Sequence, residues 1–493
     1  MARTSVLIVG GGLVGLSAAL FLQYHGVDFV LAERRTGASV LPRSRGVHVR
    51  TVELFRQIGI EDRVQKVAAT ALKAGAFGGA RHGRNLIDSE ALDLKAIHKM
   101  GLGLDPSPAN FCFCPQVLLE PVLADIARER GGDVRFGTEL TAFSASPDGV
   151  TATIGGEQLE ADYLLAADGT GSGIRTELGI TGWTLPPTHQ YLNVFVHADL
   201  TEIVTGRTFS QCEVANEVVR GMILAKNNTD EWSFHLEYDD TPPDNPLEQI
   251  HAAIGKEGMD DIDVEILARS TWDTRVHVAD EYRRGRVFLA GDAAHQHAPW
   301  GGYGANTGIA DVHNLTWKLA MVLNGHATPD LLDTYEPERR PRAVLAAEQA
   351  RLRTDFLGRY GIETPANAAE VAQQIDTGAI MMRYSYASDG YVDELTGQVG
   401  TRLPHVALSN GQSTLDLCGP GFVILAGPDA PDFGETVPVH RIGKGTELVD
   451  VDGDWADRIG LSADGALLVR PDQHVAARSD AGLTPATLAT YLP

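Results

Sequence analysis

Residues 5–35 read SVLIVGGGLVGLSAALFLQYHGVDFVLAERR, and this stretch decides the fold. The apolar run Val6–Val9 predicts a buried parallel strand, and residues 13–25 have the spacing of a helix that ends at Gly26. Residues 29–33 predict a second strand, which completes a β-α-β unit. Because glycines interrupt the apolar run, it predicts a strand, turn and helix rather than a signal peptide or membrane span.

The turn between the first strand and the helix predicts a binding site for a dinucleotide. Gly10, Gly12 and Gly15 have the spacing G-x-G-x-x-G, which allows a tight turn, close approach of a pyrophosphate and close packing of helix on strand. The amides of Leu13 and Val14 open the helix, where the dipole favours anionic oxygens. The motif does not separate FAD from NAD.

An acidic residue follows at the expected distance. Glu33 ends the second strand, about 20 residues beyond the glycines, where a carboxylate can accept a hydrogen bond from a ribose hydroxyl. We expect Arg34, the next residue, to contact the cofactor as well. The alternative is a plain glycine turn, which the placement of strand, helix and acid disfavours.

A second segment, residues 286–320, reads RVFLAGDAAHQHAPWGGYGANTGIADVHNLTWKLA. It predicts a strand at 287–290, a turn at Gly291 and a helix at 308–323. Asp292 offers a carboxylate on that turn, an acceptor suited to a neutral polyol. The loop Pro299–Asn306 holds three glycines, so its backbone can approach a flat ring. A Gly-Asp pair alone would be compatible with an ordinary surface turn.

These two segments and LLAADGTGSGIRTELGI at 164–180 resemble motifs of the flavoprotein aromatic hydroxylases, the single-component class A flavin monooxygenases. The resemblance implies that Asp292 binds a ribityl hydroxyl of FAD, and that Asp168 and Gly169 lie near the pyrophosphate. A helix N-cap or turn is the alternative for Asp168. The remaining implied cofactor contacts in the glycine loop are Pro299, Gly301, Gly302 and Asn306.

Other implied contacts lie in LPRSRGVHVRTVELF (41–55) and PQVLLEPVL (115–123). Arg43 and Gln116 stand where the family's Arg and Gln touch the cofactor, and Leu140 could offer its backbone to the adenine. For Arg43 the alternative is a solvated surface charge, and this alternative is stronger for Arg45 and Arg50. His295 and His297 favour loop packing over a metal, and no metal site is predicted.

One residue departs from the family pattern. The family often has two prolines before the glycine loop, whereas this chain has Pro299 and then Trp300. Trp300 could alter flavin mobility, line the substrate site, or simply pack as a loop aromatic.

The fold class predicted is α/β, with a Rossmann-like FAD-binding domain of the aromatic hydroxylase type. We expect that domain at 1–180 and 270–390, an inserted, mostly β substrate domain at 181–269, and a thioredoxin-like C-terminal domain at 397–493. Since the chain has no CxxC pair, the last domain is expected to be structural and not redox-active.

The closest resemblance is to bacterial hydroxylases that tailor aromatic polyketides of the anthracycline and tetracenomycin type. It implies that NADPH or NADH, bound transiently, reduces FAD, that O2 then forms a C4a-hydroperoxide, and that oxygen passes to a phenolic ring. Arg383 in MMRYSYAS is the candidate to stabilise the phenolate, with an ion-paired or surface arginine as the alternative. A Baeyer–Villiger or rifampicin-type inactivating monooxygenase, and a non-catalytic flavin- or substrate-binding protein, stay open.

Composition limits the partners. A net charge of -24 over 493 residues disfavours nucleic acid and anionic membrane and leaves a small aromatic molecule as the expected partner. Four cysteines without zinc spacing indicate a reduced, cytoplasmic protein, as a monomer or homodimer.

Overall fold

The computed structural model describes residues 2–38, 46–73, 79–92, 106–255, 262–453 and 455–493. It confirms the first β-α-β unit as β1 (Ala2–Val9), α1 (Leu13–Tyr24) and β2 (Phe29–Glu33). Strands β1 and β2 are parallel, with Val6 opposite Phe29. Residues Val6–Val9 of β1 and all of β2 are buried, as expected for a parallel sheet that is covered on both faces.

Strands from distant parts of the chain complete the main sheet, in the order β16-β17-β8-β1-β2-β5, with β7 and β6 continuing from β8. Strand β8 (Glu157–Ala166) runs parallel to β1 and ends just before Asp168. The other members are β5 (Asp133–Phe136), β6 (Leu140–Ala145), β7 (Val150–Ile154), β16 (Arg283–Arg284) and β17 (Val287–Leu289).

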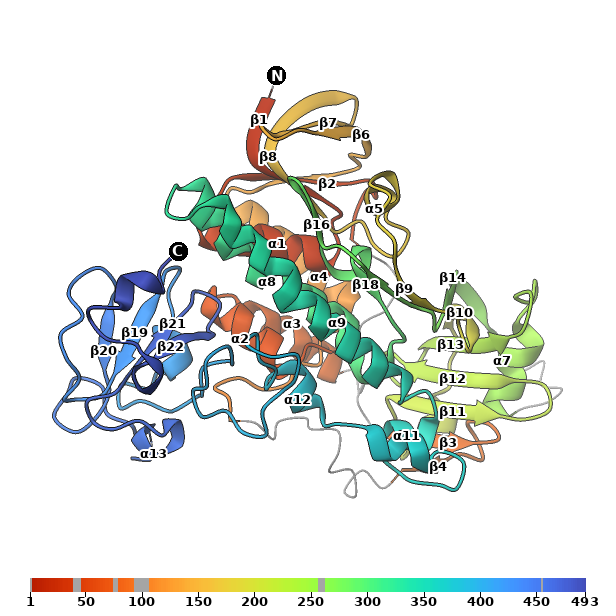
Figure 1. The fold of residues 1–493 in the computed structure, drawn as a ribbon. Coiled ribbons are helices and arrows are strands. Elements are labelled where there is room, and N and C mark those ends of the chain that lie inside the picture. The colour runs from red at the N-terminus through yellow and green to blue at the C-terminus, as the bar shows by residue number, and fades with distance from the viewer. Residues whose placement is uncertain (1, 39–45, 74–78, 93–105, 256–261, 454) are drawn as a thin grey trace.

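Long helices cover this sheet. Helix α1 packs between α4 (Gln116–Glu129) and α8 (Tyr303–Leu323). Helix α8 crosses the middle of the molecule in Figure 1. Helices α2 (Val49–Gln57) and α3 (Glu61–Lys73) follow on the same side. The buried side chains of this part form one continuous core with the sheet.

Pro337 and Pro341, which as prolines would favour a helix break, do not interrupt the helix that contains them. Helix α9 (Tyr335–Arg351) runs through both prolines, and the break lies before Tyr335, after the 3-10 turn η5 (Pro329–Thr334). Pro337 is tolerated because it falls in the first turn, where a backbone N–H has no partner within the helix. Helix α8 begins at Tyr303, five positions before the predicted start at Gly308.

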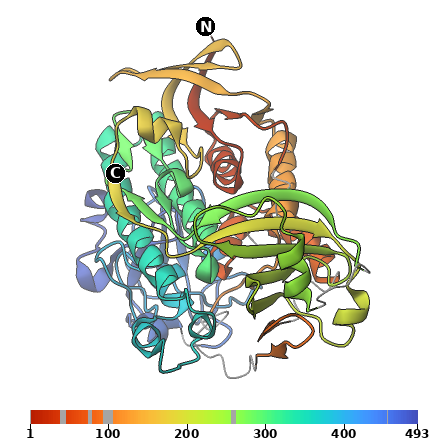
Figure 2. The ribbon, with the colours of Figure 1, turned by 90° about the vertical axis from the view of Figure 1, so that its right-hand side faces the viewer.

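A second sheet lies at the right of Figure 1 and faces the viewer in Figure 2. Its order is β14-β10-β13-β12-β11-β3-β4, so β3 and β4 join it from far earlier in the chain than residue 181. One face packs on its own apolar core and on α7 (Leu247–Ile254). The strands are β3 (Ala80–Gly83), β4 (Glu90–Ala91), β10 (Gln190–His197), β11 (Gln211–Ala215), β12 (Arg220–Ala225), β13 (Glu231–Tyr238) and β14 (Glu265–Asp273).

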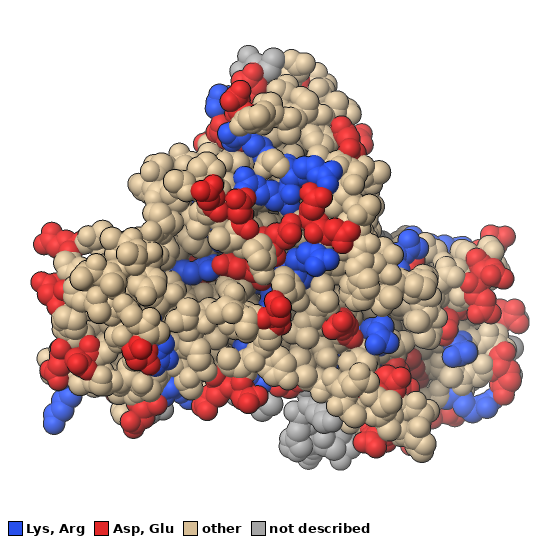
Figure 3. Space-filling view, in the orientation of Figure 1, with Lys and Arg blue, Asp and Glu red and all other residues tan. Residues whose placement is uncertain are grey.

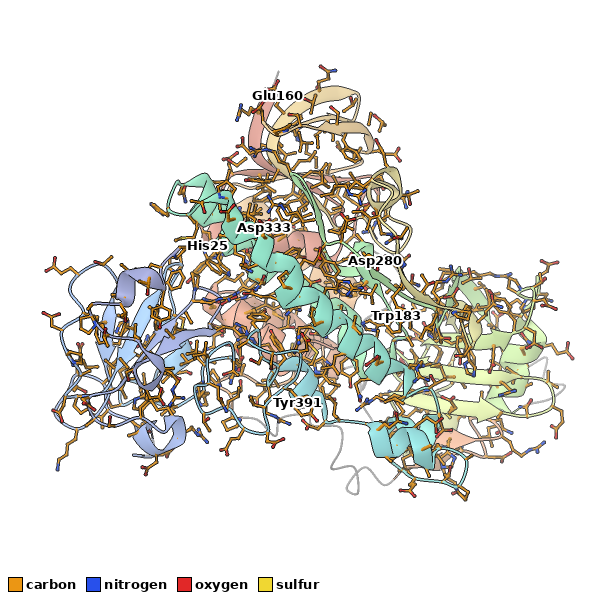
Figure 4. All side chains as sticks on the ribbon, in the orientation of Figure 1. His25, Glu160, Trp183, Asp280, Asp333 and Tyr391 are labelled. Atoms are coloured by element: carbon orange, nitrogen blue, oxygen red, sulfur yellow. The ribbon has the colours of Figure 1, made fainter. Side chains whose placement is uncertain are left out.

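A small sheet, β18 (His295–Gln296), β15 (Val276–Ala279) and β9 (Gly182–Leu185), connects the two larger ones. Trp183 of β9 and Asp280, directly after β15, mark this junction in Figure 4. The short helices are α5 (Gly173–Glu177), α6 (Thr201–Val204), α10 (Phe356–Arg359), α11 (Ala368–Gln373), α12 (Thr377–Met381) and α13 (Trp455–Ile459).

The last part of the chain forms a separate four-stranded sheet at the left of Figure 1. Its order is β20 (Val439–Arg441), β19 (Val423–Ala426), β21 (Ala466–Val469) and β22 (Val475–Arg478), with apolar cores on its two sides. Strands β19 and β21 are buried along their whole length, whereas β22 alternates between buried and partly buried residues.

Buried ion pairs join this C-terminal part to α2. Arg402 donates to Glu53 through Nε at 2.8 Å, and Arg50 donates to Glu53 at 3.0 Å and to Gln473 at 2.6 Å. The alternative of a solvated Arg50 is therefore excluded, since its side chain is buried within this network. Burial favours a higher pKa for Glu53, but the positive charges of Arg402 and Arg50 outweigh it and lower the pKa.

Acidic and basic side chains are interspersed on the face shown in Figure 3. Among the described residues, no helix combines the length and apolar character needed to cross a bilayer.

The substitution Glu53→Ala should lower the free energy of unfolding by about 3–5 kcal/mol, because it leaves two buried guanidinium groups without their carboxylate. Urea or thermal unfolding of the purified variant measures this loss. Glu217→Ala removes an exposed pair with Arg84 and should leave the midpoint unchanged. Equal midpoints for both variants would contradict the role given to Glu53.

Candidate active site

Three strand ends meet at one edge of the main sheet. Val9 of β1 pairs with Ala166 of β8, and Ala166 pairs in turn with Leu289 of β17. The turns that follow carry the glycine motif, Asp168 and Gly291, so three motifs distant in sequence become neighbours. In open α/β sheets, ligands bind outside the carboxyl ends of the strands, as they would here.

The glycine turn has the close contacts that a dinucleotide cradle requires. A Cβ on Gly10, whose φ is +111°, would lie 2.2 Å from the carbonyl oxygen of Ala167. A Cβ on Gly15 would lie 1.9 Å from the carbonyl oxygen of Gly10. Gly12 caps α1 with no side-chain hydrogen bond, and therefore the amides of Leu13 and Val14 open the helix without a capping side chain. These residues fit a pyrophosphate at the helix N-terminus.

Glu33 lies beside this turn, as predicted. Its Oε2 accepts from the amide of Gly11 at 2.6 Å, and its Oε1 accepts from the amide of Arg35 at 2.8 Å. Burial favours a higher pKa, but hydrogen bonds from Arg35 and Gly11 lower the pKa of Glu33 and keep it ionised. Arg34 is exposed, and Arg35, which the sequence did not single out, holds the carboxylate.

Asp168 has a buried carboxylate oxygen to offer a ligand. Its Oδ2 accepts weakly from the amide of Ile174 at 3.3 Å, whereas Oδ1 has no hydrogen-bond partner among the described residues. The N-cap of α5 is Ser172, which accepts from Arg175. A buried acceptor without a donor is costly, so this atom fits the hydroxyl or amide of a bound cofactor. Gly169 follows with a left-handed φ of +87°.

The second motif packs on the first. A Cβ on Gly291 would lie 2.7 Å from Cγ2 of Val14, and a Cβ on Gly308 would lie 2.8 Å from Cα of Gly291. The turn carrying Asp292 is thus in contact with the first turn of α1 and with α8. Asp292 itself is exposed on the 3-10 turn η3 (Gly291–Ala293), at the edge where the three motifs meet.

A buried carboxylate that the sequence did not single out fixes this turn. Asp311 of α8 accepts from the amide of Gly291 at 3.2 Å, from Arg339 at 2.8 Å, and pairs with His295 at 2.7 Å. Burial favours a higher pKa, but the charges of His295 and Arg339 lower the pKa of Asp311. His295 therefore holds the loop, and the described residues contain no group of three or more potential metal ligands.

The glycine loop is tied to the start of α2. Gly301 and Gly302 both have left-handed φ values, and Gly302 forms the N-cap of α8. Asn306 accepts from the amide of His48 at 2.9 Å and donates to the carbonyl of Gly302 at 2.8 Å. Burial lowers the pKa of His48 to about 4, although a hydrogen bond to the carbonyl of Gly301 acts in the opposite direction. The His48 ring is therefore neutral at physiological pH. Pro299 precedes this turn and is exposed.

Trp300 is buried where the loop meets the second sheet. Its ring lies 6.5 Å from Tyr191 and 5.9 Å from Trp272, both edge to face, and those two rings stack at 4.4 Å. The guanidinium carbon of Arg359 lies 3.7 Å from the centre of the Trp300 ring. We name the set of Tyr191, Trp272, Trp300 and Tyr303 the aromatic cluster; methionines of β12 and α12 pack with it.

The remaining predicted site residues lie on other elements. Gln116 opens α4 and donates to Glu120 at 2.6 Å, and Leu140 begins β6. Arg43 and Arg45 lie outside the described residues. Arg383 donates to Asp376 at 2.5 Å and to the carbonyl of Val392 at 3.2 Å, just beyond α12, whose residues contact the aromatic cluster.

Comparison with known proteins defines the family. Residues 3–350 match the FAD binding domain family, and residues 396–493 match the C-terminal domain of aromatic-ring hydroxylases. The chain belongs to this family and is a flavin-dependent aromatic hydroxylase, a monooxygenase.

Individual relatives cover nearly the whole chain. A tetracenomycin A2 monooxygenase-dioxygenase from Streptomyces glaucescens is 38% identical, over 96% of this chain and 93% of its own. A 4-methyl-5-nitrocatechol 5-monooxygenase from Burkholderia is 36% identical, over 96% and 94%. The crystal structure of aklavinone-11 hydroxylase with FAD and aklavinone superposes with a TM-score of 0.85 at 31% identity, covering 100% of this chain and 98% of that one.

The substitution Asp292→Ala should yield a folded protein that purifies with little or no flavin, because a ribityl hydroxyl would lose its carboxylate acceptor. Visible absorbance after purification measures bound FAD, and far-ultraviolet circular dichroism checks the fold. Asp333→Ala, which removes an exposed partner of Arg283, should stay yellow; Asp333 is labelled in Figure 4. A fully yellow Asp292→Ala protein would refute the assignment.

Proposed function

We propose that this hydroxylase uses NAD(P)H and O2 to hydroxylate an aromatic polyketide, a polycyclic phenol or quinone, in antibiotic biosynthesis. The observation that carries the proposal is the similarity along the whole chain to polyketide hydroxylases. The aromatic cluster beside the glycine loop supports it, since flat polycyclic rings pack well against Tyr and Trp.

Bound FAD, once reduced by NAD(P)H, would activate O2 so that one oxygen atom enters the ring and the other leaves as water. We propose that the glycine turn and Glu33 hold the adenosine and pyrophosphate end, together with Arg34, Arg43, Gln116 and Leu140. Asp168, Gly169 and Asp292 would hold the middle of the cofactor, and the loop Pro299–Asn306 would face the flavin ring.

The domain arrangement expected from the sequence belongs to this proposal. The segments 1–180 and 270–390 would bind FAD, and 181–269 would cover the substrate. Residues 397–493 would form a thioredoxin-like domain without a redox role, since Cys418 there is buried and burial raises its pKa to about 12.

A second candidate is hydroxylation of a single-ring phenol. The similarity to a nitrocatechol monooxygenase favours it, at an identity close to that of the polyketide enzymes. Oxygen insertion into a ring ketone, as in Baeyer–Villiger enzymes, would be recognised from the product.

Oxidation of NADPH or NADH under air tests the function directly. We expect anthraquinone and naphthacene phenols to stimulate it and to gain one oxygen atom by mass spectrometry, with nitrocatechols as the single-ring comparison. A yellow protein that no aromatic compound stimulates would instead be a flavin-binding protein without this activity.

Arg383 stays the candidate to stabilise the substrate phenolate. Arg383→Ala should slow hydroxylation roughly 100-fold while FAD remains bound, because a fixed positive charge near the reacting oxygen is lost. Stopped-flow measurement of the oxygen-transfer step gives the rate, and Arg351→Ala, at an exposed position, is the control. An unchanged rate would limit Arg383 to a structural role that includes its ion pair with Asp376.

A further inference from the structure

Two opposite charges face each other at the rim of the aromatic cluster without touching. Nη1 of Arg359 in α10 lies 3.8 Å from Oε2 of Glu213 in β11. Both atoms are buried, and neither makes a hydrogen bond within the described part of the chain. This distance is short enough for an ion pair but too long for a hydrogen bond.

This arrangement is unfavourable in the protein alone. Arg359 donates through Nε to the carbonyl of Arg353 at 3.2 Å and through Nη2 to the carbonyl of Thr354 at 3.1 Å. Among the described residues, Nη1 is therefore the nitrogen of this group that lacks a partner, and a buried polar atom without one costs free energy. Burial raises the pKa of Glu213, against the opposing charge of Arg359. Nonetheless, 27% of the Glu213 side chain stays accessible, so one side of it is open to a small molecule.

The sheet register shows which way Glu213 faces. Glu213 pairs with Met222, and Met222 pairs with His235, so the three share one face of the second sheet. Met222 packs in the aromatic cluster. The neighbours of Glu213 in β11 belong to the apolar core on the opposite face. Glu213 therefore faces the glycine loop.

Trp300 connects the pair to that loop. The guanidinium carbon of Arg359 lies over its ring at 3.7 Å, which fixes the planar group by a cation–π contact. Nε1 of Trp300 is buried and also lacks a partner among the described residues. Three polar groups that need partners thus converge where the loop meets the sheet.

We propose that Glu213 and Arg359 recognise the polar edge of the substrate, an aromatic ring with a hydroxyl next to a carbonyl. Glu213 accepts a hydrogen bond from the hydroxyl, Arg359 donates to the carbonyl, and Trp272 and Trp300 pack against the ring. Trp300 becomes a specificity element because it positions Arg359. This assignment rests on the proposed function as a hydroxylase of aromatic phenols.

Binding to the oxidised holoenzyme tests the assignment without turnover. The probes are alizarin, which has a hydroxyl beside a quinone carbonyl, and anthraquinone, which has the carbonyl alone; perturbation of the flavin spectrum reports both. The wild type should prefer alizarin. Glu213→Gln and Arg359→Met should each bind alizarin roughly 10-fold more weakly, or worse, with FAD content retained. The binding of anthraquinone should weaken only in the Arg359→Met variant.

Glu231→Gln is the matched control, since Glu231 lies in the same sheet but pairs with Lys226. It should bind both probes like the wild type. Three results would each overturn the proposal. The first is unchanged affinity for alizarin in both variants, and the second is an equal loss of affinity for both probes in Glu213→Gln. The third is a wild type that does not bind alizarin more tightly than anthraquinone. Hydroxylation of other phenols by the wild type would then still stand, so the two failures are distinguishable.

Discussion

The site depends on the interactions of one buried carboxylate, that of Asp311. It ties the turn at Gly291 to α8 by accepting from the Gly291 amide, and it ties α8 to α9 through Arg339. A charged group without solvent must be matched, and His295 and Arg339 match it. Because Gly291 also touches α1, this network fixes the second motif against the first.

A second set of buried ion pairs joins parts of the fold that lie farther apart in the sequence. Arg470 and Lys318 both bind Glu338, while Arg50 and Arg402 bind Glu53. These pairs connect the C-terminal sheet to α2, α8 and α9. The C-terminal part therefore braces the helices that carry the glycine loop, although its own cysteine is buried and far from thiolate character.

Local patterns in the sequence predicted the local structure well. The strand at Val6–Val9 and the helix after it follow from an apolar run and a glycine spacing, and both formed nearly as expected. Long-range pairing could not be predicted in this way. Nothing near residues 80–91 indicates that they extend a sheet whose other strands begin at residue 190, because pairing partners are set by tertiary packing.

The candidate site shows the same division. Gly10, Gly15 and Gly291 could be found because close backbone contacts demand glycine. The burial of Arg50 could not be settled from sequence because it depends on a partner over 300 positions away, and Glu213 carried no motif at all. The glycine turns proposed to hold the cofactor are thus readable from sequence, whereas residues whose role depends on distant partners emerge only from the fold.

The central claim is that two distant motifs form one FAD site that transfers oxygen from O2 to an aromatic ring. Turnover under isotopically heavy O2, with mass spectrometry of the product, tests it most directly. The account predicts that the product carries one heavy oxygen atom. A product oxygen that derives from water, or a product that gains none, would contradict it.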